Sequence, residues 1–208
     1  QVADVASQQG LTDREEFIRL ARDREFIRSL GIKAETLEGY LYPDTYKFPR
    51  PIKARELLVA MVEQLKQVVG PDLLARMEEL KMTIHEVLTL ASVIEKETGT
   101  GSERPEISAV FHNRLKKHIP LQSDPTVIYG LPSFDGNLRK KDLSSPSPYN
   151  TYRVQGLPPG PIANPGIQAI RAALYPSDSR SLYFVSRNDG THQFSATLIE
   201  HNKAAEKY

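Results

Sequence analysis

The stretch that most constrains the fold runs from residue 83 to residue 98. Thr83 precedes an apolar run and Glu86 follows three residues later, a spacing that is typical of a capping box at a helix start. Apolar side chains then recur at helical intervals over a wide arc, so we predict a central helix that is largely buried. These side chains are Ile84, Val87, Leu88, Leu90, Ala91, Val93 and Ile94. Only a narrow polar strip remains: His85, Thr89, Ser92 and Lys96.

Two glutamates, Glu95 and Glu97, end this predicted helix. At about 100° per residue they point to different sides, and Glu97 lies over the bulkier neighbours Ile94, Val93 and Leu90. A carboxyl group held against apolar side chains has a raised pKa, because burial disfavours its charged form. A glutamic acid that keeps its proton near neutral pH can act as a general acid. The alternative is that both acids face water where the last helical turn frays.

Composition excludes several kinds of site. The 208-residue chain has no cysteine, which excludes disulfides, thiolate metal sites and cysteine nucleophiles. The net charge is +1, so nothing indicates a nucleic-acid partner. The histidines lack metal-ligand spacing and no glycine-rich phosphate loop is present, so we expect neither a metal nor a nucleotide. No apolar run approaches the ~20 residues that a membrane-spanning helix needs.

The remaining pattern predicts an α+β fold, mostly helical with a small antiparallel sheet. An Asn-Asp-Gly turn at 188–190 separates two short strands, at 182–185 and 192–195. Residues 119–162 are rich in Pro, Gly and Ser and are predicted to be irregular and functional. Further helices are predicted over 2–9, 12–26, 54–68 and 73–80, from a cap at Ser102, from Pro165 onward, and at the end of the chain around Leu198 and Ile199.

Two other groups of residues have competing interpretations. Three tyrosines, at positions 40, 42 and 46, either contact sugar or fill a seam between parts of the fold. Arg114 belongs to a basic cluster with Lys116, Lys117 and His118, at the end of a predicted helix. The helix dipole favours cations there and is enough to explain the cluster. Attraction of an anionic glycan is the weaker interpretation.

Four blocks of the sequence occur together in a specific order. They are residues 91–98 (ASVIEKET), 121–130 (LQSDPTVIYG), 149–152 (YNTY) and 156–160 (GLPPG). With 37–46 and 181–185 they resemble the YceG-like (MltG) family of endolytic murein transglycosylases over most of the chain. The resemblance implies a YceG-like catalytic domain at 37–208. It also implies that residues 1–36 are the remnant of a LysM-like module, for which a plain helical lead-in is the alternative.

The resemblance also implies a catalytic residue. In the family, the acid is the second glutamate of the Glu-Lys-Glu-Thr motif, which is Glu97 here. The helix geometry selects the same residue. Members of the family cut the MurNAc-GlcNAc bond without adding water and leave 1,6-anhydro-MurNAc ends. One carboxyl group can suffice, because the sugar's own 6-hydroxyl attacks and Glu97 acts first as acid and then as base. No cofactor is expected.

Polar residues in the same blocks offer the hydrogen bonds that a sugar needs. We expect the following to bind substrate: Glu95, Gln122, Asp124, Tyr149, Asn150 and Tyr152. Asp124 could instead start a turn with Pro125, and Asn150 could instead satisfy the backbone of its own loop.

Three other functions remain open at this point. A non-catalytic peptidoglycan-binding module would have exposed acids and an ordinary pKa at Glu97. A lysozyme-type hydrolase would use Asp124 as a second carboxylate. A pyridoxal-phosphate-dependent aminodeoxychorismate lyase would need a Schiff-base lysine, for which Lys96 is the nearest candidate.

The resemblance implies a cellular setting as well. The substrate and partner would be peptidoglycan glycan strands, and penicillin-binding proteins would work nearby. Family members carry an N-terminal membrane anchor, absent from this sequence, which would hold the catalytic domain outside the cytoplasm at the bacterial inner membrane.

Overall fold

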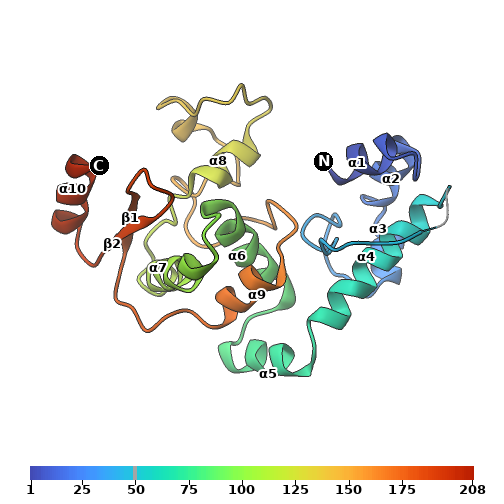
Figure 1. Ribbon diagram of the computed structural model, residues 1–208, viewed down its shortest axis with the longest axis horizontal. Helices are drawn as coiled ribbons and strands as arrows, with labels where there is room; N and C mark the ends of the chain where they lie inside the picture. Colours follow the sequence, from blue (N-terminus) through green and yellow to red (C-terminus); the bar gives the residue numbers. More distant parts are fainter. Residues whose placement is uncertain (49–50) are drawn as a thin grey trace.

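The computed structural model describes residues 1–48 and 51–208. Helix α6 (Ile84–Glu97) lies at its centre, in contact with α7 (Arg104–Lys116), α8 (Asp124–Gly130) and α9 (Ile167–Leu174), as Figure 1 shows. Other helices are α1 (Val2–Gln8), α2 (Arg14–Leu20), α3 (Arg24–Ser29), α4 (Ala54–Val68), α5 (Pro71–Leu80) and α10 (Leu198–Lys207). Two short 3-10 turns are η1 (Gly101–Glu103) and η2 (Asp142–Ser144).

The central helix forms as predicted. The Thr83 side chain accepts a hydrogen bond from the backbone N–H of Glu86, and the Glu86 carboxylate accepts one from the N–H of Thr83 (2.8 Å), which completes the capping box. Residues 87–94 are all buried. The predicted polar strip is therefore only partly at the surface. Thr89 donates to the carbonyl of His85 (2.7 Å), and Ser92 Oγ accepts from the N–H of Ile162 (2.9 Å), so burying these hydroxyls leaves them satisfied.

The N-terminal part differs in detail from the prediction. The helix expected over 12–26 is two helices, because Asp13 and Asp23 each cap a separate start through their carboxylates. The first of them begins after Asp13, which accepts from the N–H of Glu16 (2.8 Å), and not at residue 12 as predicted. Phe17 is buried in the core, and α2 packs against α4. The assignment of 1–36 to a LysM-like module stays a prediction.

The tyrosines of the 37–46 segment pack inside the fold. Tyr40 and Tyr42 are buried, and the hydroxyl of Tyr46 donates to the carbonyl of Tyr42 (2.7 Å). The hydroxyl of Tyr40 lies 2.9 Å from Nδ1 of His85. Nε2 of that ring lies 2.9 Å from the Pro159 carbonyl, which can only accept, so Nε2 is the donor of that bond. These contacts match the seam interpretation of the tyrosines.

The C-terminal part contains the predicted hairpin. Strands β1 (Tyr183–Ser186) and β2 (His192–Ser195) pair antiparallel, and the turn between them places Asn188 and Gly190 at φ values of 61° and 87°. These left-handed conformations suit Asn and Gly. Helix α10 packs on the hairpin (Figure 1), and it leaves Leu198 and Ile199 exposed. The α+β prediction is confirmed. Among the described residues, no helix has both the length and the apolarity to cross a membrane.

Two boundaries around α6 were predicted wrongly. Ser102 does not cap α7, because it lies inside the turn η1, and Glu103 occupies the cap position without a side-chain bond. The segment 119–162 is not wholly irregular, because it contains α8. Pro125 stands in the first turn of α8, where its missing N–H leaves no bond unmade.

Candidate active site

Glu97 ends α6 with its carboxyl group largely enclosed. The hydroxyl of Ser123, the residue that precedes α8, donates a hydrogen bond to Oε1 of Glu97. Burial raises the pKa of Glu97 to about 7, the Ser123 bond opposes that rise, nearby Asp124 adds to it, and the Arg114 charge lowers it. A carboxyl group in this position is partly protonated at neutral pH, which a general acid requires.

Glu95 lies in a different environment, two residues earlier on the same helix. Its Oε1 accepts from Arg104 Nη2 (3.0 Å) and its Oε2 accepts from the N–H of Gly166 (3.1 Å). Arg104 begins α7 and Gly166 precedes α9, so this carboxylate joins three helix ends. The two glutamates do point to different sides, as predicted. Both oxygens of Glu95 are occupied by protein donors.

Asp124 and Tyr152 come together beside Glu97. The Tyr152 hydroxyl donates to Oδ1 of Asp124 (2.6 Å), and Asp124 is the first residue of α8. Burial, then the bond to Asp124, raise the pKa of Tyr152 well above its ordinary value, so the phenol keeps its proton. The Asp124 side chain is exposed and Tyr152 is partly exposed, so both can be reached by a ligand.

Gln122 is connected to the site through Arg114. Its side-chain oxygen accepts from Arg114 Nη1 (3.1 Å), which also donates to the carbonyls of Pro120 and Leu121 (both 3.0 Å). Nε of Arg114 donates to the carbonyl of Leu182 (2.6 Å). Arg114 lies in the last turn of α7, as predicted, but it is 7% exposed and bonded to protein acceptors, so the helix dipole alone does not explain its position. Its spacing of four residues from buried Val110 places it on the apolar face of α7, a signal that the sequence contained.

Asn150 and Tyr149 have different surroundings. Asn150 is fully buried; its amide donates to the carbonyls of Leu143 (3.0 Å) and Ser145 (2.8 Å), and its oxygen accepts from the N–H of Tyr152 (3.0 Å). The position matches the alternative interpretation, in which Asn150 satisfies its own loop. The Tyr149 ring packs against that of Tyr129 with centroids 4.8 Å apart, and both rings are partly exposed.

Three hydroxyl residues next to the site were missed by the sequence analysis. Ser123, Thr126 and Thr151 are all buried and hydrogen-bonded to one another. Their one sequence signal is their place in the blocks 121–130 and 149–152. A Ser or Thr shows neither charge nor periodicity that would distinguish a positioning role from ordinary loop chemistry.

A cleft of about 670 Å³ is lined by Glu95, one of the predicted site residues, but not by Glu97. It lies between the N-terminal helices and the end of α6, and its lining includes Arg22, Glu38, Lys96 and Tyr129. Helix α8 has seven residues and so spans about 10 Å. Its first residue, Asp124, lies beside Glu97, and its sixth, Tyr129, lies in the cleft wall.

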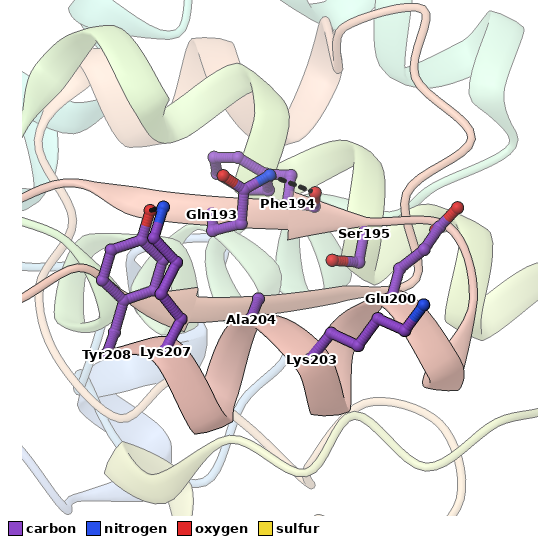
Figure 2. Close-up of a pocket in the computed structure, with 8 residues that line it drawn as sticks. All are labelled: Gln193, Phe194, Ser195, Glu200, Lys203, Ala204, Lys207 and Tyr208. Carbon is purple, nitrogen blue, oxygen red and sulfur yellow. Dashed lines mark hydrogen bonds between the residues drawn. The ribbon is translucent and has the colours of Figure 1, made fainter.

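A second hollow is separate from these residues. About 320 Å³ in volume, it lies between β2 and α10, and its lining includes Gln193 of the strand and Lys203 of the helix (Figure 2). It contains none of the predicted site residues. In the described part of the chain, no three His, Asp or Glu side chains gather in a way that could hold a metal ion.

Comparison with known proteins identifies the family of this chain. The YceG-like family matches residues 1–207. An endolytic murein transglycosylase of Bacillus subtilis (strain 168) is 46% identical over 173 residues, which cover 83% of this chain and 48% of that protein. One of Streptococcus pneumoniae serotype 2 (strain D39) is 34% identical over 155 residues, covering 72% and 28%. The chain thus spans about half the length, or less, of these curated relatives.

The fold agrees with a solved structure as well. The crystal structure of a YceG-like protein from Listeria monocytogenes superposes with a TM-score of 0.87 and 38% sequence identity, over 98% of this chain and 71% of that one. The sequence and structural matches both extend over nearly the whole chain. The chain therefore belongs to the YceG-like family.

Proposed function

We propose that this chain is the catalytic part of an endolytic peptidoglycan lytic transglycosylase. The observation that carries the proposal is Glu97, a carboxyl group enclosed at the end of the central helix with its pKa raised to about 7. The names of the similar Bacillus and Streptococcus proteins support the same activity. A binding module without catalysis needs no such group, and Lys96 is exposed, unlike the desolvated lysine that Schiff-base chemistry favours.

In the proposed reaction Glu97 transfers a proton twice. Protonated Glu97 gives its proton to the oxygen that links MurNAc to GlcNAc, and the bond from the MurNAc anomeric carbon to that oxygen breaks. The 6-hydroxyl of the same MurNAc then bonds to the anomeric carbon, and its proton returns to Glu97. The products are a 1,6-anhydro-MurNAc end and a free GlcNAc 4-hydroxyl, and no water is consumed. Attack within one sugar ring supplies a high effective concentration of the nucleophile.

We propose that the glycan lies along α8. Tyr152 and Asp124 would contact the sugars next to the cleaved bond, with Gln122 at the edge of the site. Tyr149 and Tyr129 offer an aromatic wall on which a sugar face can stack. From there the strand would enter the cleft beside Lys96. Glu95 and Asn150 support the site through protein contacts in this arrangement.

One rival function has a specific observation in its favour. Asp124 lies close enough to Glu97 to raise its pKa, so a hydrolase with these two carboxylates is the second candidate. In that enzyme Asp124 would activate water or attack the sugar. The products would then be reducing ends in place of anhydro ends.

The setting of the activity is also a proposal. We infer that the substrate is peptidoglycan, met outside the cytoplasm by an enzyme anchored at the bacterial inner membrane. Penicillin-binding proteins that make new strands are the expected neighbours, because an enzyme that cuts strands internally acts on their product. The word murein in the names of the relatives supports the substrate.

Mass spectrometry of digested peptidoglycan tests the proposal. We expect anhydro-ended fragments from the wild-type chain and none from Glu97→Gln, which keeps the size of the side chain and removes its acidity. Glu95→Gln is the matched control, since it makes the same change two residues away, and it should still give anhydro ends. Fragments that carry added water would overturn the transglycosylase in favour of the hydrolase. Anhydro ends from Glu97→Gln would overturn the assignment of the acid.

A further inference from the structure

A closed ring of hydrogen bonds lies directly behind Glu97. The backbone N–H of Ser123 donates to Oγ1 of Thr151 (3.0 Å), and Oγ1 of Thr126 donates to the backbone carbonyl of Ser123 (2.6 Å). The two threonine hydroxyls are 2.8 Å apart. Thr126 lies in α8 and Thr151 in the 149–152 block, so the ring joins two separate segments through the backbone of Ser123.

The donor and the acceptor of every bond in this ring follow from the two backbone groups of Ser123. The carbonyl of Ser123 can only accept, so the single proton of the Thr126 hydroxyl points to it. Thr151 must then donate its own proton to Thr126, while it accepts from the N–H of Ser123. All three groups are buried, where water does not compete and where a chain of aligned bonds is strengthened. The ring uses the backbone N–H and carbonyl of Ser123, so the Ser123 hydroxyl is available for a bond outside the ring.

The backbone before Ser123 is also fixed. Gln122 has a φ of 52°, a left-handed conformation that non-glycine residues seldom adopt. The N–H of Gln122 donates to the carbonyl of Thr151 (3.1 Å), and Arg114 holds its side chain (3.1 Å). Several contacts thus hold the turn in one conformation, as is common where a site must be held in one geometry. Its result is that the Ser123 hydroxyl points at Glu97.

We propose that Ser123, held by the Thr126–Thr151 ring, is a positioning residue that keeps the acidic proton of Glu97 on Oε2. The hydroxyl of Ser123 donates to Oε1, and an oxygen that accepts this bond is the carbonyl oxygen of the protonated acid. The proton is therefore carried by Oε2. The inference rests on the proposed function, because it states which oxygen of Glu97 carries the proton that is transferred in the proposed reaction.

The same oxygen then serves both halves of the reaction. Oε2 gives its proton to the leaving oxygen and later accepts the proton of the 6-hydroxyl, while Oε1 stays bonded to Ser123 throughout. Charge on the carboxylate between these steps is stabilised by the Ser123 donor. The other charged and titratable groups around Glu97 are Asp124 of α8, Arg114 of α7 and Tyr152 of the loop. None of these three groups donates a hydrogen bond to Oε1.

Two variants separate the hydroxyl from the ring. Ser123→Ala removes the donor but keeps the backbone groups that form the ring. Thr151→Val removes the ring but keeps the donor, and Thr151→Ser restores a hydroxyl at that place. Thr89→Val is the matched control, because Thr89 is another buried threonine, on α6 itself, whose hydroxyl donates to the carbonyl of His85.

The first readout needs no substrate. Carbon-13 NMR of labelled glutamate carboxyls, with the Glu97 signal assigned by its loss in Glu97→Gln, gives the titration of Glu97 directly. We expect its pKa to rise in Ser123→Ala, because a donor to the charged form is lost. A smaller rise is expected in Thr151→Val, and none in Thr151→Ser or Thr89→Val. An unchanged titration in Ser123→Ala, or an equal shift in Thr89→Val, overturns the inference.

The second readout is kcat against pH. We expect Ser123→Ala to lower kcat about 10- to 100-fold with little change in KM, because a misplaced reacting group loses rate on this scale. The alkaline limb of the kcat profile, where kcat falls as pH rises, should move to higher pH together with the pKa of Glu97 measured by NMR. The double variant Ser123→Ala, Thr151→Val should be no slower than Ser123→Ala alone, since both act through one bond. Additive losses overturn the proposed ring. Anhydro ends from Glu97→Gln would instead overturn the assignment of Glu97 as the acid, and fragments with added water would overturn the proposed transglycosylase. In both cases the NMR result would still decide the inference.

Discussion

Glu95 and Glu97 are the same residue type, two positions apart on one helix, yet their surroundings are opposite. Glu95 receives an arginine and a backbone N–H, one on each carboxylate oxygen. Glu97 receives a single neutral hydroxyl, is enclosed, and has the acidic Asp124 nearby. The first arrangement compensates a negative charge and the second penalises it. A helix end can thus carry two carboxyl groups whose surroundings have opposite effects on their charge.

The difference shows what to look for in related sites. A carboxyl group that has donors on both oxygens is committed to holding the fold together, because loss of either partner leaves a buried charge unmet. A carboxyl group with one donor and one free oxygen can exchange a proton. Burial is the first cause of the raised pKa of Glu97, and the count of donors on each oxygen adds to the distinction between the two glutamates.

The largest expected effect is on the rate of cleavage. Glu97→Gln should lower the initial rate at least about 10³-fold, because general acid and base catalysis are lost together. Glu95→Gln should stay within about tenfold of the wild type, since the amide oxygen can still accept from Gly166. Release of soluble fragments from peptidoglycan, with folding checked by circular dichroism, measures both. Equal losses in the two variants would remove the distinction between the two glutamates.

The next effect is on stability, and its sign depends on pH. The folded pKa of Glu97 is raised from 4.5 to about 7, so folded protein binds more protons than unfolded protein between these values. Stability should therefore fall as pH rises through this window. Glu97→Gln should be more stable than the wild type above pH ~8, by up to about 3 kcal/mol, and the gain should vanish below pH ~4. Urea unfolding at several pH values measures it, and a gain that does not depend on pH would contradict the raised pKa.

A smaller effect is expected at the Glu95 pair. Arg104 and Glu95 are 15% and 28% exposed, so their bond is partly shielded from water. A double-mutant cycle with Glu95→Gln and Arg104→Met should give a coupling of about 1 kcal/mol. The exposed pair Arg139–Asp135 is the comparison, and its coupling should be smaller and more sensitive to salt. Equal coupling in both pairs would mean that Glu95 is an ordinary surface acid.

Periodicity predicted the parts of this fold that depend on local sequence. The capping box of α6 and the hairpin turn at Asn188 were both readable, because each is encoded within a few residues. The helical wheel also separated Glu95 from Glu97. The break between α2 and α3 was missed, because Asp23 looks like any polar surface residue until it caps a new helix.

The site itself depends on contacts between distant segments. Ser123 reaches Glu97 across 26 positions and meets Thr151 across 28, and neither contact leaves a periodic trace. The sequence predicted Asn150 and Tyr152 alike as substrate-binding residues, yet Asn150 is fully buried and Tyr152 is partly exposed. A resemblance to a family marks a block of residues. Which of them face a substrate and which support the loop depends on the packing.

The smallest predicted effect tests how the neighbours of Glu97 set its pKa. Asp124→Asn removes a negative charge beside Glu97, so the pKa of Glu97 should fall and the alkaline limb of kcat should move to lower pH. Asp135→Asn is the control, because it makes the same change in an exposed acid that pairs with Arg139. It should leave the limb in place.

The size of the loss in rate completes this test. A transglycosylase that uses Glu97 alone should keep most of its kcat in Asp124→Asn when each variant is measured at its own optimum pH. A hydrolase would lose its second carboxylate, and kcat would fall by orders of magnitude at every pH. A modest fall with a shifted limb therefore leaves Glu97 as the one acid and makes Asp124 a neighbour whose charge raises the pKa of Glu97.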